Sequence, residues 1–305
     1  MRWVRIVPRY GGEGRVSLKV LVGGVLTETR WGVAMDDSKR RAQLTYNAAA
    51  DHFDDPPLGF WDRYGQATVE RLDVRRGANV LDVCAGAGGS ALPAAARVGP
   101  TGRVVAVDLA ENLLALARRK AERAGLSSVL STRCADVDTL DERDGRFDAV
   151  ICVFGVFFFP DMTAATSRLW RLVGPDGQLA VTTWGPRLFE PANSVFWDEV
   201  SRLRPELNRS YQPWESLNDP DALTALLHGA GVEDALIVAV DDTFPLASAE
   251  DFWSIVLGSG FRATHDALTG DEQTVVHDRV VARLTSAGVT AIETNVIYAT
   301  ATKDM

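Results

Sequence analysis

Short apolar runs alternate with amphipathic stretches through the middle of the chain. An apolar run at 80–83 precedes an alanine-rich helical stretch at 90–98, and a second run at 103–107 precedes a helix at 110–124. The pattern continues with expected strands at 129–132, 149–153 and 178–184 and a helix at 162–172. Strands alternating with helices of this length predict an α/β fold, a doubly wound and mostly parallel sheet.

The flanking regions complete this pattern. Residues 37–73 have helical spacing broken at Pro56-Pro57, and the C-terminal part adds helices at 219–230 and 271–287 and strands at 235–240 and 291–302. We therefore predict four parts, which are an extension (1–34), an N-terminal helical part (35–75), an alternating core (76–187), and a C-terminal part that completes the sheet (188–305).

The first 34 residues differ from the rest. They hold six basic residues against two acids, and six glycines and one proline interrupt any helical or strand period. Met35 then opens an ordinary-looking sequence. We expect residues 1–34 to be a poorly ordered extension, read through from an upstream start codon.

Composition narrows the function. Asp and Glu number 41 against 32 Lys and Arg, a net charge of -9, which disfavours binding to a nucleic-acid backbone. The spacing of Cys84, Cys134 and Cys152 fits neither a zinc site nor a disulfide framework, so we expect reduced thiols, a cytoplasmic protein and no metal. The longest apolar run, 149–159, is too short to span a membrane.

A glycine-rich turn follows the first strand of the core. Asp82 lies near the end of that strand, and Gly86 and Gly88 open the next helix. Asp108 ends the second strand twenty residues beyond Gly88, where an acid can accept hydrogen bonds from ribose hydroxyls. This arrangement predicts a nucleoside site at the carboxyl edge of the sheet.

Two cofactor classes fit the turn. Gly86-x-Gly88-x-x-Ala91 matches a dinucleotide fingerprint, which leaves an NAD(P)-dependent oxidoreductase as an alternative. The Asp82 carboxylate would, however, oppose a pyrophosphate by about 1 kcal/mol or more. The same carboxylate suits S-adenosylmethionine, which carries a sulfonium and an ammonium and no phosphate. A plain tight turn with two incidental aspartates is the structural alternative.

With these motifs, the sequence resembles the class I S-adenosylmethionine-dependent methyltransferases, and is most similar to their ubiquinone/menaquinone-biosynthesis type between about Tyr46 and Gly185. The resemblance implies a Rossmann-like, seven-stranded sheet whose last strand, near Ile297, is antiparallel. It also implies that residues 35–75 form a helical lid, 76–187 the S-adenosylmethionine-binding core, and 188–305 an acceptor cap. Cys84 replaces the first glycine of the family's loop. The cofactor-binding residues that the resemblance implies are Tyr46, Asp82, Gly86, Ala87, Gly88, Asp108, Leu109, Asp136, Val137 and Val153.

The acceptor is not identified by the resemblance. The quinone-pathway enzymes tend to have Leu-Arg-Asn after the fourth strand, whereas this chain has Val156 and three phenylalanines. The region after Trp184 is rich in aromatic residues, which favours a small apolar or aromatic acceptor. These residues are Phe189, Phe196, Trp197, Tyr211, Trp214, Phe252, Trp253 and Phe261.

The expected reaction is direct displacement of a methyl group, in which the protein aligns the acceptor and excludes water. His52, on the N-terminal helices, is the candidate general base. An inactive cofactor-binding protein of the same fold remains an alternative. An arsenite methyltransferase would need thiolates in the acceptor region, where none of the cysteines lies. Association into a homodimer stays open.

Overall fold

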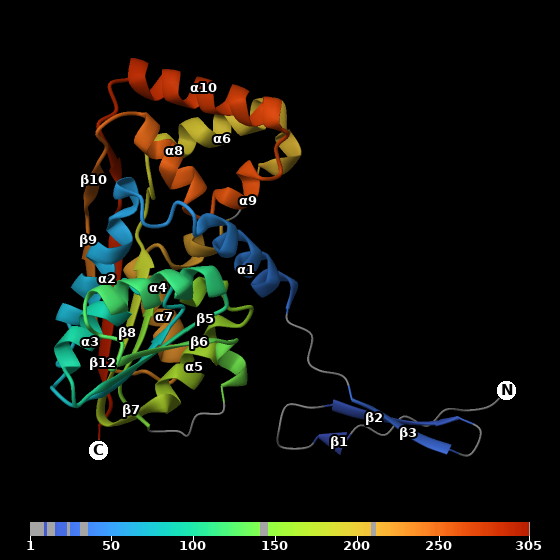
Figure 1. Ribbon diagram of the computed structural model, residues 1–305, viewed down its shortest axis with the longest axis vertical. Coiled ribbons are helices and arrows are strands. Elements are labelled where there is room, and N and C mark those ends of the chain that lie inside the picture. The colour runs from blue at the N-terminus through green and yellow to red at the C-terminus, as the bar shows by residue number, and fades with distance from the viewer. Residues whose placement is uncertain are drawn as a thin grey trace.

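A seven-stranded sheet forms the centre of the molecule (Figure 1). The computed structural model describes residues 9–10, 16–22, 25–30, 36–140, 146–208 and 212–304. The strand order is β6-β5-β4-β7-β8-β12-β9. The strands are β4 (Asn79–Val83), β5 (Arg103–Asp108), β6 (Leu130–Cys134), β7 (Phe147–Val153), β8 (Val173–Trp184), β9 (Ala235–Val240) and β12 (Val296–Thr302).

The strand directions confirm the predicted fold class. β4, β5, β6, β7 and β8 pair in parallel, whereas β12 runs antiparallel to both β8 and β9. Helices on the two faces bury the central strands, which explains the nearly continuous apolar sequence of β4. The connecting helices are α3 (Ala91–Val98), α4 (Glu111–Arg123), α5 (Met162–Leu172) and α7 (Pro220–Gly229).

The predicted final strand is two strands. β11 (Ala291–Glu293) pairs with the short strand β10 (Thr243–Pro245), and β12 begins at Val296. The Asn295 side chain separates them by accepting from the Asp242 N–H (2.9 Å) and donating to the Pro186 carbonyl (2.9 Å). The spacing of apolar residues in the sequence does not indicate this break.

The first N-terminal helix lies at the carboxyl edge of the sheet, and the last starts there and runs along one face of the sheet toward Gln178 of β8. The N-terminal helices are α1 (Asp37–Ala49), a 3₁₀ turn η1 (Pro56–Leu58) and α2 (Phe60–Glu70). α1 ends at Ala49, before the prolines, and Pro56 and Pro57 instead occupy the first positions of η1, where a missing N–H donor is tolerated. α2 sits directly on the glycine loop, since a Cβ on Gly65 would lie 2.3 Å from the Gly89 carbonyl carbon.

Four further helices form a layer beyond the carboxyl edge, seen at the top of Figure 1. They come from two separate segments, one holding α6 (Ala192–Leu203) and the other holding α8 (Glu250–Leu257), α9 (Arg262–His265) and α10 (Gly270–Ser286). The fully buried Glu199 joins the two segments through its ion pairs with Arg202 of α6 and Arg283 of α10. We call this layer the cap.

The N-terminal segment contains regular structure. β1 (Arg9–Tyr10), β2 (Val16–Val22) and β3 (Val25–Arg30) pair into a separate antiparallel sheet. We expected no strand period here, and that expectation is wrong for these residues. The Gly-Gly sequence between β2 and β3, which we took as an interruption, is typical of a two-residue hairpin. That the segment is an extension outside the core remains a prediction.

In the parts of the chain that the structure describes, no helix has the length and apolarity to cross a bilayer.

Candidate cofactor and acceptor site

The loop after β4 enters the left-handed region three times, first at Cys84 with φ +56°. Gly86 has φ +51° and Gly88 φ +89°, conformations that side chains rarely adopt. A Cβ on Gly86 would project into a cavity, with its nearest neighbours 3.8 Å away on Leu113 and 3.9 Å away on Phe53. A Cβ on Gly88 would instead press on Leu92 and Ala117 at 3.2 and 3.3 Å. Gly86 therefore makes room for a ligand, whereas Gly88 lets α3 and α4 pack closely.

Asp108 ties this loop to the second strand. Its Oδ2 accepts the Gly86 N–H and its Oδ1 accepts the Ala110 N–H, both at 2.8 Å. Burial raises the pKa of Asp108, and the backbone hydrogen bonds oppose the rise. The carboxylate lines the cavity beside Leu109, where ribose hydroxyls would meet it.

The cavity has a volume of about 120 Å³ and brings together Tyr46, Gly86, Ala87, Asp108, Leu109 and Val153 of the predicted cofactor residues. Asp136 and Val137 line a smaller cavity of about 40 Å³, which shares Asp108 and Leu109 with the first. Two predicted residues do not line either cavity: Gly88, for the packing reason above, and Asp82.

Asp82 lies behind the cavity wall and is fully buried. Its Oδ2 accepts a hydrogen bond from the Ser90 hydroxyl at 2.8 Å, and Ser90 lines the cavity. Its Oδ1 has no partner among the described residues. Burial raises the pKa of Asp82 to about 7, although the Ser90 hydrogen bond opposes this. A buried acceptor without a donor is costly, so a cationic ligand group here would relieve that cost.

Trp61 provides a hydrogen-bond donor beside the cavity, whereas Asp82 provides an acceptor. It was not among the site residues predicted from the sequence. Its indole Nε1 is buried and has no acceptor among the described residues. The ring lines the cavity and stacks on Phe53 at 5.4 Å between centroids. One unpartnered acceptor and one unpartnered donor next to the same cavity match the ammonium and carboxylate of an α-amino acid. With Asp108 and Asp136 at the other end, the residues fit S-adenosylmethionine, and Asp82 does not fit a pyrophosphate.

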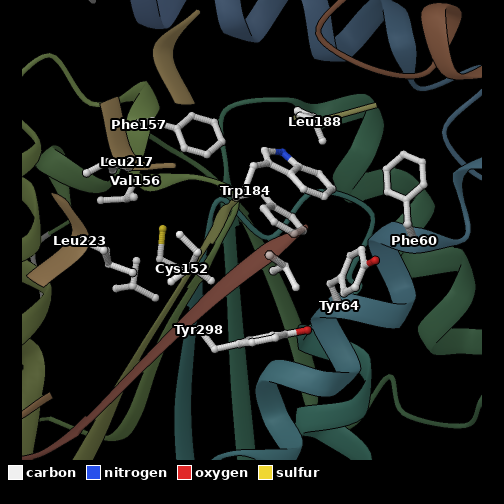
Figure 2. Close-up of a cluster of buried hydrophobic side chains, with 14 of the residues drawn as sticks. Phe60, Tyr64, Cys152, Val156, Phe157, Trp184, Leu188, Leu217, Leu223 and Tyr298 are labelled. Carbon is white, nitrogen blue, oxygen red and sulfur yellow. The ribbon is translucent and has the colours of Figure 1, made fainter. Parts of the chain in front are cut away.

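A second cavity, of about 20 Å³, adjoins the first and shares Tyr46, Trp61 and Phe154 with it. Trp184 stacks on Phe154 at 3.8 Å between centroids, and Figure 2 shows its indole between Phe157 and Phe60. We call this second cavity the aromatic pocket; its described lining residues are Tyr46, Trp61, Phe154, Phe157, Trp184, Leu188, Phe189, Trp214, Ser259, Gly260 and Phe261. None of these side chains is charged at neutral pH, and none is a cysteine.

Tyr46 stands where the two cavities meet. Its hydroxyl forms no hydrogen bond with a described residue and lies 3.7 Å from the position of a Cβ on Gly260, in the cap. Burial, and then the nearby charge of Asp108, raise the pKa of Tyr46 far above its usual range. The phenol therefore stays protonated, so it can donate a hydrogen bond to a ligand but does not act as a base.

The structure does not bring His52 to the site. The residue follows the end of α1 and lines neither cavity. Its Nδ1 contacts Asp55 Oδ2 at 2.9 Å, and 36% of its side chain is exposed. The neighbouring Phe53, not His52, lines the cofactor cavity from this segment, so the structure gives no geometric support for His52 as a base.

The sequence analysis also missed Lys39, Ala42 and Gln43, which line these cavities from α1. They lie seven, four and three residues before Tyr46, on the same helix face. Helical spacing from the predicted Tyr46 was a signal that could have found them.

The sheet order with one antiparallel strand, the acid-and-glycine loop and an acid after the second strand define a class, the Rossmann-like methyltransferases of class I. Comparison with known proteins agrees. Residues 80–177 match the methyltransferase domain family. The chain is 27% identical to nocamycin O-methyltransferase of Saccharothrix syringae over 80% of this chain and 90% of that protein.

Two other similarities support the same class. The ubiquinone/menaquinone biosynthesis C-methyltransferase of Enterobacter sp. (strain 638) is 28% identical over 57% of this chain and 72% of its own length. A Haemonchus contortus phosphoethanolamine N-methyltransferase 2, solved with S-adenosylmethionine, shares the fold with a TM-score of 0.56 at 18% identity. The match covers 92% of this chain and 63% of that one. The family match and the two relatives support a class I S-adenosylmethionine-dependent methyltransferase, and the structural neighbour supports its fold.

Proposed function

We propose that the protein transfers the methyl group of S-adenosylmethionine to an uncharged, apolar or aromatic small molecule held in the aromatic pocket. The observation that carries the proposal is the shared wall of the two cavities, because Tyr46, Trp61 and Phe154 line both. A donor in the first cavity and an acceptor in the second would meet at that wall.

When bound, S-adenosylmethionine supplies a methyl group that its sulfonium has already activated. The chain's own residues would hold and align the two molecules. Asp108 would hold the ribose, and Asp82, buried behind the cavity wall at Ser90, would attract the ammonium. The protonated Tyr46 hydroxyl would donate a hydrogen bond to an oxygen of the acceptor. The aromatic walls exclude water, and alignment of this kind contributes up to about 7–11 kcal/mol in favourable systems.

The described walls also favour an uncharged acceptor. A phosphorylated amine, as in the name of the Haemonchus protein, needs cationic groups to bind its phosphate, and the described lining of the aromatic pocket has none. The two named relatives methylate oxygen and carbon. A neutral phenol, enol or ring carbon fits the pocket better than a phosphobase, and the proton that it loses on methylation would pass to bulk water as the product leaves.

The test is incubation of the protein and a cell extract with S-adenosylmethionine labelled in its methyl group. We expect one labelled, organic-extractable product that is absent with the Gly86→Val variant. Binding of the cofactor without a labelled product from any extract would instead support an inactive binding protein. Absence of cofactor binding by calorimetry would overturn the cofactor assignment itself.

We also propose that the protein is cytoplasmic and, as a second proposal, that it forms a homodimer. Three free cysteines support the first. Light scattering at micromolar concentration tests the second, and a monomer mass would contradict it.

A further inference from the structure

Lys39 is a buried lysine on the lid helix α1, and only 6% of it is exposed. Its Nζ lies 2.9 Å from both carboxylate oxygens of Asp136 and also hydrogen-bonds Asp138. Burial lowers the pKa of Lys39, but the hydrogen bonds to Asp138 and Asp136 outweigh it and raise the pKa overall. The ammonium therefore stays charged and is fully engaged by two carboxylates.

The two partners of Lys39 belong to a different part of the chain. Asp136 caps the 3₁₀ turn η2 (Val137–Thr139) that follows β6, and its side chain lines the smaller cavity with Leu109 and Val137. This cavity continues the adenosine end of the cofactor cavity. The ion pair thus joins the first turn of the lid helix to the edge of the cofactor site.

The face of α1 that begins with Lys39 forms one wall of the site. Ala42, Gln43 and Tyr46 follow at the i+3, i+4 and i+7 positions, and all of them line a cavity. Gln43 Nε2 donates to the Leu109 carbonyl at 3.0 Å. Any motion of α1 away from the sheet therefore moves Tyr46 away from the meeting point of the two cavities.

The C-terminal end of α1 is held by a neutral hydrogen bond and by a contact from the cap. Asn47 Oδ1 accepts the Asn112 N–H at 2.9 Å, and Arg262 of the cap donates to the Ala48 carbonyl at 3.1 Å. At the first turn, by contrast, the described attachment to the sheet is the charged group of Lys39, Asp136 and Asp138. Breaking a buried ion pair by removing one partner is strongly destabilising, so this attachment governs whether that end opens.

We propose that Lys39 is a positioning residue that closes α1 over the adenosine end of the cofactor cavity and so holds Tyr46 at the junction with the aromatic pocket. Release of Lys39 from Asp136 and Asp138 opens the entry for the cofactor. The inference rests on the cofactor assignment, since it concerns how the same site opens and closes.

The test compares the binding kinetics of S-adenosylhomocysteine, the demethylated product, in native protein and in Lys39→Met. We expect both the association and the dissociation rate constants to rise about tenfold, within the usual range of coupling between a closing element and a ligand. The equilibrium constant then changes less than either rate. Stopped-flow tryptophan fluorescence measures both rates, and Lys39→Arg should return them toward native values.

Arg41→Met is the matched control, because it removes the same charge from an exposed position of the same helix. We expect native rates from it. Asp138→Asn is the milder variant, since Asp138 is 47% exposed, and it should move both rates in the same direction by a smaller factor. It also keeps the test decisive should Lys39→Met fail to fold.

Native rates in Lys39→Met, or in Asp138→Asn when Lys39→Met does not fold, would overturn the inference. So would a faster dissociation with an unchanged association rate, because Lys39 would then be a plain ligand or packing contact. Absence of nucleoside binding by the native protein would overturn the cofactor assignment as well, which separates the two failures.

Discussion

The cofactor cavity and the aromatic pocket share a wall, yet they are built in different ways. The part of the cofactor cavity that was predicted from the sequence lies in three short segments, the loop after β4 and the turns after β5 and β6, although side chains from α1 and α2 also line the cavity. The aromatic pocket depends on side chains from α1, α2, the ends of β7 and β8, and two parts of the cap. Local backbone geometry leaves a readable motif in the sequence, whereas side chains that converge from distant segments do not.

The two regions also differ in polarity. Next to the cofactor cavity, a buried carboxylate oxygen of Asp82 has no partner among the described residues, and neither has the indole N–H of Trp61 in the wall shared with the aromatic pocket. The aromatic pocket has apolar walls and few polar groups among its described residues. The cofactor site thus contains unsatisfied polar groups that a charged cofactor can satisfy, whereas the acceptor site is lined by aromatic rings. Variants on each side should therefore separate cofactor affinity from acceptor turnover.

The largest effect is expected at Gly86. Gly86→Val places a branched side chain in the cavity at a left-handed φ and should lower S-adenosylhomocysteine affinity at least about 100-fold, measured by calorimetry. Gly125→Val is the control, because Gly125 has φ +68° and no atom within 4 Å of its Cβ position. Both variants carry similar backbone strain. Equal binding by the two would place the cofactor elsewhere.

Asp82→Asn should separate stability from binding. The pKa of Asp82 is raised from 3.8 to about 7, so the folded state holds this proton more tightly than the unfolded state. This group therefore reduces the stability of the ligand-free protein as pH rises from about 4 to about 7. At pH 8, Asp82→Asn should stabilise that protein by about 2–4 kcal/mol in urea unfolding, and at pH 4 the gain should vanish.

The same variant should weaken S-adenosylhomocysteine binding at pH 8 by about tenfold or more, because an ion pair with the ammonium is lost. Asp234→Asn, at an exposed position, is the matched control and should change neither property. A stability gain that does not depend on pH would contradict an ionised, unpartnered Asp82.

Trp214→Ala tests the other side of the comparison. Trp214 lines the aromatic pocket and not the cofactor cavity. We expect S-adenosylhomocysteine affinity within twofold of native and kcat/KM for the acceptor found by methyl labelling to fall about tenfold, as for a lost apolar contact. A fall in nucleoside affinity of the same size would mean that the two cavities are not separate sites.

His52→Ala is expected to have the smallest effect. Its side chain contacts Asp55 outside both cavities, so kcat should stay within about twofold and the pH–rate profile should keep its shape. Loss of an ionisation from that profile would restore His52 as a base and contradict the geometry.

The sequence predicted the sheet well where each element is locally distinct. The helix α5 (Met162–Leu172) and the strand β9 (Ala235–Val240) have the predicted bounds, and the antiparallel direction near Ile297 is confirmed. β10 was missed because a three-residue strand leaves no period, and β8 starts five residues earlier than predicted because Gly174-Pro175 suggests a turn.

Prediction of the candidate site is limited in the same way, because neighbouring motifs can be found from the sequence and contacts between distant segments cannot. Asp82, Gly86 and Asp108 lie within 26 residues and could be found by their spacing. The Lys39–Asp136 ion pair joins residues 97 positions apart, and neither residue type is unusual where it stands. Trp61 could not be distinguished from an ordinary core residue, since its significance comes from an indole N–H without a partner, which a sequence does not reveal.

The cap has a consequence for how such proteins diversify. Its helices enter as two inserts, one between β8 and α7 and the other between β10 and β11, so neither interrupts the segments that contact the nucleoside. Exchange of either insert leaves the loop after β4, Asp108 and the Lys39 ion pairs in place, although the second insert also carries Arg262, which contacts the end of α1. Proteins that share this scaffold can thus acquire new small-molecule acceptors through different inserts, while the residues that bind the methyl donor stay the same.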